Sequence, residues 1–112
     1  MKIPNKNRRF KKLRIISSNY IITYHKELKD EKGELIDGDI GETEKEIKVL
    51  EGMNYQRTLQ VITHEAIHGI KWELRFNAKN DEDMNILLTT GITCFIRDNP
   101  EFIMEYIGIL NQ

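Results

Sequence analysis

The chain has 112 residues, enough for one domain with a single core and too few for a separate substrate-binding subdomain. With 39% hydrophobic residues, 31% charged residues and a formal net charge of -1, its composition is that of a soluble globular protein. No apolar run is long enough to span a bilayer, the basic start lacks the apolar stretch of a signal peptide, and the single Cys94 excludes an internal disulfide. We therefore expect a cytoplasmic protein.

The beginning of the chain is strongly basic. Seven of its first fourteen residues are Lys or Arg and none is acidic, namely Lys2, Lys6, Arg8, Arg9, Lys11, Lys12 and Arg14. Such a segment suits nucleic acid or an acidic partner. The balance of the chain is acidic, however, and no nucleic-acid-binding motif accompanies the segment. We interpret residues 1–12 as a solvated basic N-terminal arm that flanks Phe10 and Leu13, and we do not expect nucleic acid as a partner.

Four short segments before residue 51 predict strands. They are residues 13–17, 20–28, 38–41 and 46–50. The first two are rich in Ile, Tyr and Thr, and the pair Ser18-Asn19 between them suits a hairpin turn. In the last segment Ile47 and Val49 alternate with polar residues, which predicts one wet face. We expect a small, mostly antiparallel sheet in which His25 is an exposed or half-buried strand residue without a metal role.

A long helix is predicted from Asn54, a good N-terminal cap, to about Arg75. Its apolar residues recur at helical spacing as a core stripe of Tyr55, Leu59, Ile62, Ala66 and Ile70. No proline interrupts this segment, and Gly69 is its only weak helix former.

This helix contains the only H-E-x-x-H of the chain, His64-Glu65-Ala66-Ile67-His68. On a helix the two histidines project from one face, so that two imidazoles bind one cation while Glu65 lies beside them. The alternatives are ordinary helix residues or a structural zinc site. A structural site usually has four Cys or His ligands, and this chain has one Cys and three His, so the motif favours a catalytic zinc ion.

Two further helices are predicted after a polar break at residues 77–80. The first, residues 81–98, has an acidic start and an apolar stripe of Met84, Leu88, Gly91, Ile92 and Phe95, with Cys94 as a small buried residue. In the last helix Asn99 suits the cap and Pro100 the first helical position. Its predicted buried face consists of Phe102, Ile103, Tyr106, Ile107 and Leu110.

A catalytic zinc site needs a third protein ligand. The extended pattern with a third histidine fails, because Lys71 and Leu74 stand where its glycine and histidine would be. Glu73 lies about 180° around the helix from His64. A carboxylate must therefore come from elsewhere, and a second helix packed antiparallel to the first would bring one close. The candidates are Asp81, Glu82 and Asp83, among which periodicity does not choose.

The residues that carry a family resemblance are His64 to Ile70 (H-E-A-I-H-G-I), Glu82-Asp83, Gly91-Ile92 and Arg97-Asp98-Asn99-Pro100. With these the chain resembles, over nearly its whole length, the small phage and prophage zinc metallopeptidases of the gluzincin type, distant relatives of the ImmA/IrrE group. Only the metal motif is highly specific. The resemblance implies Glu82 as the third ligand, from a glutamate helix. It also implies a minimal zincin-like α+β domain, with a sheet followed by the H-E-x-x-H helix, the glutamate helix and a C-terminal helix. Asn85 and Thr89-Thr90 depart from the family pattern.

The expected function is that of a zinc-dependent metallopeptidase. His64, His68 and Glu82 would bind Zn²⁺, and Glu65 would act as general base for a water that attacks a peptide bond of a protein substrate. A sheet edge would hold the substrate as an extended strand. By analogy with the ImmA/IrrE group, the substrate would be a regulator or repressor. The alternatives are a zinc-containing phage regulatory module that binds without cleaving, motivated by the departures, and a nucleic-acid-associated regulator that uses the basic arm. Tyr20, Tyr24, Tyr55 and Tyr106 are candidates to stabilise the oxyanion, and the sequence does not choose among them.

Overall fold

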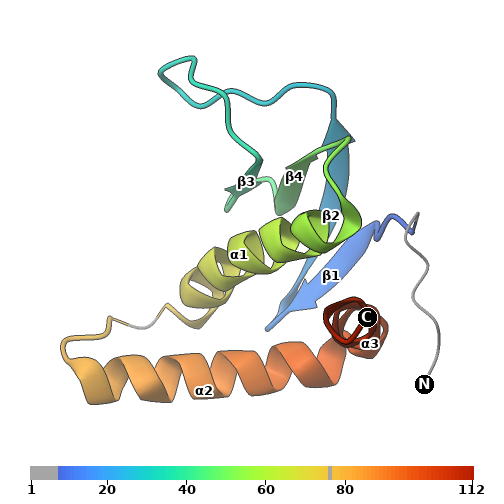
Figure 1. Cartoon of the computed structure of the whole chain (residues 1–112). Helices are drawn as coiled ribbons and strands as arrows, with labels where there is room; N and C mark the ends of the chain where they lie inside the picture. The colour runs from blue at the N-terminus through green and yellow to red at the C-terminus, as the bar shows by residue number, and fades with distance from the viewer. Residues whose placement is uncertain (1–7, 76) are drawn as a thin grey trace.

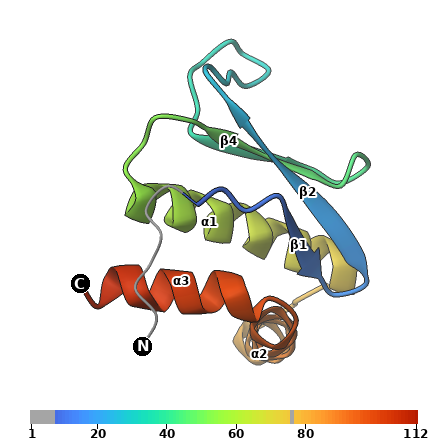
Figure 2. The ribbon, with the colours of Figure 1, turned by 90° about the vertical axis from the view of Figure 1, so that its right-hand side faces the viewer.

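The computed structural model describes residues 8–75 and 77–112, which form a four-stranded sheet and three helices. The elements are β1 (Lys12–Ile15), β2 (Ser18–His25), β3 (Gly38–Gly41), β4 (Glu46–Leu50), α1 (Tyr55–Leu74), α2 (Asp81–Asp98) and α3 (Pro100–Leu110). Helix α1 lies against one face of the sheet, and α2 and α3 lie on the far side of α1 (Figures 1 and 2). The expected α+β class is confirmed. Within the described ranges no helix is both long and apolar enough to cross a membrane.

The sheet is mixed, with the strand order β1-β2-β4-β3. The two predicted hairpins, β1–β2 and β3–β4, are present and antiparallel. The central strands β2 and β4 pair in parallel, so the sheet differs here from the mostly antiparallel one that the sequence predicts. A parallel pair needs a long connection, and residues 26–37 together with β3 provide it. This order places the apolar strands β2 and β4 at the centre and leaves the short β3 at an edge.

The first hairpin turns two residues earlier than predicted. Ile15 pairs with Ser18, so the turn consists of Ile16 and Ser17 rather than Ser18 and Asn19. Ile16 adopts a left-handed conformation, with φ of 55°, which is rare for a β-branched residue. The hydroxyls of Ser17 and Ser18 donate hydrogen bonds to the carboxylate of Glu73 on α1, over 3.0 and 2.7 Å. This tertiary contact fixes the turn against the local preference.

The core lies between the sheet and α1. Four residues of the predicted helix stripe are at most 1% exposed, and Tyr55 is half-buried. The buried face of the sheet consists of Leu13, Ile15, Tyr20, Ile22, Ile40, Ile47 and Val49. His25, at the end of β2, is half-buried, and its Nε2 lies 2.7 Å from Oγ1 of Thr23. The buried stripe of α1 and the half-buried position of His25 agree with the sequence analysis.

Helix α2 packs on α1 around Gly91. A Cβ atom at Gly91 would lie 2.1 Å from Cγ2 of Ile70, so the glycine permits this close approach. The remaining buried residues of α2 are Leu87 and Phe95, whereas Ile92 is 43% exposed. The predicted stripe was therefore partly wrong. The contact at Gly91 determines which face of α2 is buried, and the hydropathy pattern alone does not.

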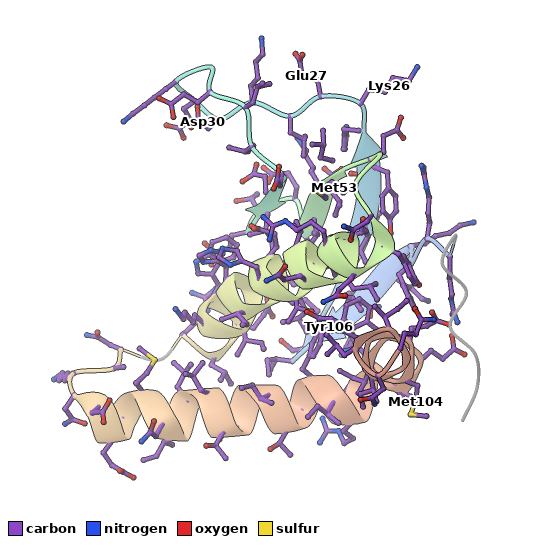
Figure 3. The ribbon with its side chains drawn as sticks, viewed as in Figure 1. Lys26, Glu27, Asp30, Met53, Met104 and Tyr106 are labelled. Atoms are coloured by element: carbon purple, nitrogen blue, oxygen red, sulfur yellow. The ribbon has the colours of Figure 1, made fainter. Side chains whose placement is uncertain are left out.

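Helix α3 begins at Pro100 as predicted, but Asn99 does not cap it with its side chain. The Asn99 amide instead accepts a hydrogen bond from the N–H of Arg14 (2.8 Å) and donates one to its C=O (2.7 Å). It therefore occupies the outer edge of β1 like a residue of a neighbouring strand. Phe102 is buried, whereas the predicted core residues Ile107 and Leu110 are 40% and 55% exposed. Met104 projects from the side of α3 that faces away from α1 and the sheet (Figure 3).

From residue 8 onward most basic side chains of the N-terminal segment are exposed, as expected, but the segment itself packs against the rest of the protein. The side chain of Phe10 is buried among the core residues, and the guanidinium group of Arg8 lies 4.4 Å from its ring centroid and pairs with Glu101. These contacts tie the segment to α3. Residues 1–7 of the predicted arm lie outside the described residues.

Residues 26–37 extend beyond the end of the sheet before the chain returns as β3 (Figures 1 and 3). Oδ1 of Asp30 accepts hydrogen bonds from the N–H groups of Lys32 and Glu34, each over 2.9 Å. These bonds fix the turn of the connection. The chain then reaches Gly38 beside α1.

Candidate metal centre

The histidine motif lies in the middle of an uninterrupted helix. The side chain of Asn54 caps α1 by accepting a hydrogen bond from the N–H of Arg57 over 2.8 Å. The helix ends at Arg75, whose left-handed conformation (φ of 50°) stops it. Residues four apart on such a helix share one face, so the cap and the absence of proline together bring His64 and His68 side by side.

The two imidazoles of the motif lie side by side at the surface. The ring centroids of His64 and His68 are 5.2 Å apart, with an angle of 75° between their planes. The side chain of His64 is 69% exposed. The ring of His68 stacks on that of Trp72, with 6.2 Å between centroids and 26° between planes. The indole therefore restricts the orientation of one imidazole, while both remain accessible to an ion from solvent.

Glu65 differs from its histidine neighbours because its residue is only 8% exposed. Burial raises the pKa of its carboxyl above the usual value, the neighbouring His64 and His68 oppose this shift, and the charge of Asp39 adds to it. The Nε2 atom of His64 lies 3.9 Å from the Glu65 carboxylate. Among the described residues we find no hydrogen bond to this carboxylate. It is thus free to interact with a ligand, water or substrate.

The edge strand β3 passes directly over this part of α1. A Cβ atom at Gly38 would lie 2.5 Å from Cγ1 of Val61 and 3.4 Å from Cγ of Glu65. The absence of a side chain at Gly38 is therefore what allows the backbone of β3 to come so close to Glu65. Because β3 pairs only with β4 in the sheet, its other edge faces away from the sheet beside the motif.

A small cavity of about 220 Å³ opens between β3 and α1. It is lined by Asp37, Gly38, Arg57, Gln60, Val61, His64 and Glu65. At its rim the guanidinium group of Arg57 pairs with Asp37 over 2.9 Å and donates a hydrogen bond to Gln60 over 3.1 Å. The cavity is therefore lined by the buried carboxylate and one imidazole of the motif, and its rim is polar. Its volume suits a single side chain.

The acidic start of α2 is not grouped with the histidines. Within residues 8–75 and 77–112, no three or more His, Cys, Asp or Glu residues are placed so that they hold a metal ion together. Helices α1 and α2 meet at Gly91, nine residues after Glu82, and the first turns of α2 extend past the end of α1 (Figure 1). Glu82 is exposed there, and the carboxylate of Asp83 accepts a hydrogen bond from the N–H of Lys79 over 3.3 Å.

The residues present therefore fit part of a zinc site. Two accessible imidazoles on one helix face match the ligands and spacing that zinc takes from an H-E-x-x-H helix. The third protein ligand is not in place among the described residues. The assignment of zinc, and of Glu82 as a ligand, stays a prediction.

The tyrosine hydroxyls that are hydrogen-bonded lie away from the motif. Those of Tyr20, Tyr24 and Tyr55 donate to Glu73, to the carbonyl of Phe10 and to Glu105, respectively. Tyr106 packs against the ring of Phe102, and its side chain lies on α3 between that helix and α1 (Figure 3). No tyrosine lines the cavity beside Glu65.

No family model, curated protein or solved structure matches this chain. The resemblance to small phage metallopeptidases consequently depends on the residues quoted for it. Asn85, Thr89 and Thr90, which depart from that family pattern, are all exposed on α2.

Sequence reasoning missed the residues that surround the motif on the side of β3. Asp37, Arg57 and Gln60 form the rim of the cavity, but nothing in their local pattern distinguishes them from ordinary surface residues. Gly38 did carry a signal, because a glycine within a strand often marks a close approach of the backbone to another element. In the structure that element is α1, whereas a Cβ atom at Gly41 would meet only the side chain of Glu44 in the following turn.

Proposed function

We propose that the chain is a zinc-dependent metallopeptidase that hydrolyses a peptide bond in a protein substrate. The observation that carries the proposal is the pair of accessible imidazoles, His64 and His68, beside the buried carboxylate of Glu65 and under the edge strand β3. His64 and His68 would hold the zinc ion. On the family resemblance Glu82 is the third ligand, with Asp81 and Asp83 as alternatives. Among the described residues these carboxylates do not form a three-ligand group with the histidines, so the proposal requires the first turn of α2 to move when metal binds.

Each residue of the motif has a separate task in this reaction. The zinc ion, when bound, supplies an acidic water and polarises the substrate carbonyl. His64 and His68 would bind it through their imidazole nitrogens. Glu65 accepts a proton from the attacking water and returns it to the leaving amine. A carboxylate whose pKa is raised by burial is a stronger proton acceptor than an exposed one, and no hydrogen-bond donor among the described residues competes for it.

The position of β3 is consistent with a substrate that binds as an extended strand. As an edge strand, β3 offers backbone groups to a peptide beside the motif, and Gly38 brings them close to Glu65. The cavity lined by Asp37 and Arg57 would then take one substrate side chain next to the scissile bond. A flexible segment of another protein, such as a regulator or repressor, suits so open a site.

A second candidate is a zinc-containing module that binds a partner without cleaving it. The lack of a third ligand among the described residues favours this alternative, because two imidazoles alone hold zinc weakly. Glu65→Gln separates the two functions. A peptidase would keep its zinc and lose turnover by about 100-fold or more, whereas a binding module would keep both its zinc and its partner affinity.

The first experiment is a measurement of zinc per chain in protein purified without added metal. We expect about one zinc ion per chain in the unmodified protein and in Glu65→Gln, and a strong loss in His68→Ala. His25→Ala is the matched control, because this histidine lies on β2 away from the motif and should not affect zinc content.

Glu82→Ala tests the third ligand in the same measurement. Loss of zinc would support Glu82, and retained zinc would transfer the role to Asp81, Asp83 or another carboxylate. If the unmodified protein holds no zinc even after incubation with the metal, the peptidase proposal must be abandoned.

A further inference from the structure

A groove larger than the cavity beside Glu65 lies at the opposite edge of the sheet, along β1. It has a volume of about 530 Å³ and runs between residues 8–14 and the junction of α2 and α3. Five of the side chains that line it are basic, namely Arg8, Arg9, Lys11, Lys12 and Arg14, and two are acidic, namely Asp98 and Glu101. Because β1 and β3 are the two edge strands of the sheet, this groove is separate from the histidine motif.

Two of the five cations hold the segment in place. Arg8 pairs with Glu101 and lies over the ring of Phe10. Arg9 pairs with Glu51 over 3.3 Å, and its guanidinium group is 4.8 Å from the ring centroid of Tyr24. Together with the buried ring of Phe10, these contacts place the groove wall against the fold, which lowers the cost of ordering it when a ligand binds.

The other three cations form no direct ion pair within the described part of the chain, although the charge of Arg14, after that of Arg97, helps to lower the pKa of Asp98. Lys11, Lys12 and Arg14 are exposed, and the one further carboxylate of the groove, Asp98, is already bound by Arg97 over 2.8 and 3.0 Å. A net positive charge therefore remains on β1, at Lys12 and Arg14, and directly before it, at Lys11. This arrangement attracts an anionic partner.

The backbone of β1 indicates what kind of anion fits. Ile22 donates a hydrogen bond to the carbonyl of Lys11, and in an antiparallel pair the next residue then turns its N–H and C=O outward. At Arg14 both outward groups are occupied by the Asn99 amide. At Lys12 the same outward groups face away from β2, where they can pair with one residue of an extended peptide.

The groove lacks what a single-stranded nucleic acid uses in addition to charge. Bases stack on exposed aromatic rings. Among the described residues two aromatic side chains line the groove, Phe10 and Phe102, and they are 7% and 1% exposed and belong to the core. Backbone pairing and charge are available to a ligand here, whereas base stacking is not.

We propose that this groove binds an extended acidic peptide segment of a partner protein. The peptide backbone pairs with Lys12 at the outer edge of β1. Its carboxylates lie against the side chains of Lys11, Lys12 and Arg14. This binding site is independent of the proposed peptidase centre, and either proposal can fail without the other.

The test is a fluorescence anisotropy titration with a short labelled peptide of alternating Glu and Val, at low ionic strength. The groove variant is Lys11→Glu/Lys12→Glu/Arg14→Glu, and the control is Lys26→Glu/Lys29→Glu/Lys32→Glu, which changes the net charge equally on the loop of residues 26–37. We expect the groove variant to lower the affinity by about tenfold or more and the control to change it little. The corresponding variant with Gln at the three groove positions should give a smaller loss, and it replaces the Glu variant if that one does not fold.

Two further probes address the chemistry of the ligand. The same peptide with N-methyl groups at alternate positions should bind more weakly, because it cannot pair with the strand. A single-stranded oligothymidine of equal charge should bind no more tightly than the peptide. The proposal is overturned if the peptide does not bind the unmodified protein, if groove and control variants lose affinity equally, or if only the oligothymidine depends on the groove cations.

Discussion

Glu65 and Glu73 lie two turns apart on the same helix, and both are buried, yet their surroundings are opposite. The side chain of Glu73 is 6% exposed and is surrounded by donors. They are the hydroxyls of Ser17, Ser18 and Tyr20 and the ammonium group of Lys45. Burial alone would raise the pKa of Glu73, but these donors together lower it to about 2. Glu65 has no such donors among the described residues, and its pKa is raised.

This difference separates a carboxylate that the fold uses for structure from one that remains available to a ligand. Glu73 connects the end of α1 to the β1–β2 turn and, through Lys45, to the β3–β4 turn, so its charge is fully used within the fold. Glu65 has a desolvated charge with nothing among the described residues to neutralise it except the two histidines. A buried charge without compensating hydrogen bonds destabilises the folded protein, and such groups are typical of functional sites. The following changes test the contrast, from the largest expected effect to the smallest.

Glu73→Ala should destabilise the protein most. It removes the common acceptor of three hydroxyls and leaves the ammonium group of Lys45 without its carboxylate partner. We expect the free energy of unfolding to fall by about 3–5 kcal/mol, measured by urea denaturation at neutral pH. Glu42→Ala, at an exposed position before β4, is the control and should change it by less than about 0.5 kcal/mol. A loss at Glu73 as small as that of the control would show that the network is not structural.

The same carboxylate should make the fold sensitive to acid. Its pKa is lowered from 4.5 to about 2 on folding, so its contribution is fully present above pH 4.5 and is lost as the pH falls toward 2. The shift corresponds to about 3 kcal/mol. We expect the stability difference between the unmodified protein and Glu73→Gln to shrink by about this amount between pH 6 and pH 2, measured by urea denaturation at each pH. A difference that does not change with pH would contradict the lowered pKa.

Gly38→Ala tests the support that β3 gives to Glu65. The added methyl group would lie 2.5 Å from Cγ1 of Val61, so the strand or the helix must shift, at a cost of about 1–3 kcal/mol. Gly41→Ala is a matched control at the other end of β3, because the atom it meets first is the carboxylate end of the flexible Glu44 side chain, which can move away. Equal losses in thermal unfolding would mean that close packing at Gly38 is not what positions the strand.

Much of the fold was predictable because local signals and burial agree. The alternation around Ile47, the helical stripe of α1, the cap at Asn54 and the proline at position 100 each predict an element that the structure contains. The parallel pairing of β2 with β4 was not predictable. It depends on where a long connection returns, and no local pattern encodes that.

The candidate site was predictable only where its residues are adjacent in sequence. His64, Glu65 and His68 lie on one helix, so helical geometry alone brings them together. A contact with α2 depends on the register of two packed helices, which Gly91 and Ile70 determine. For this reason sequence reasoning narrowed the third ligand to three acidic residues but did not place any of them. The hydrogen bonds of Asn99 to β1 were likewise not predictable, because its partner Arg14 is 85 residues away in the sequence.

Glu65→Gln should have the smallest effect on stability, and it completes the contrast with Glu73. The substitution keeps the shape of the side chain and removes a charge that burial disfavours. In metal-free protein at neutral pH we expect the free energy of unfolding to stay the same or to rise by up to about 1 kcal/mol, measured by urea denaturation after treatment with a chelator. The matched variant Glu73→Gln should lower it, because the amide provides a weaker acceptor for Lys45 and the hydroxyls. If Glu65→Gln instead costs more than about 2 kcal/mol, Glu65 has a structural partner, and its role as a free proton acceptor would have to be given up.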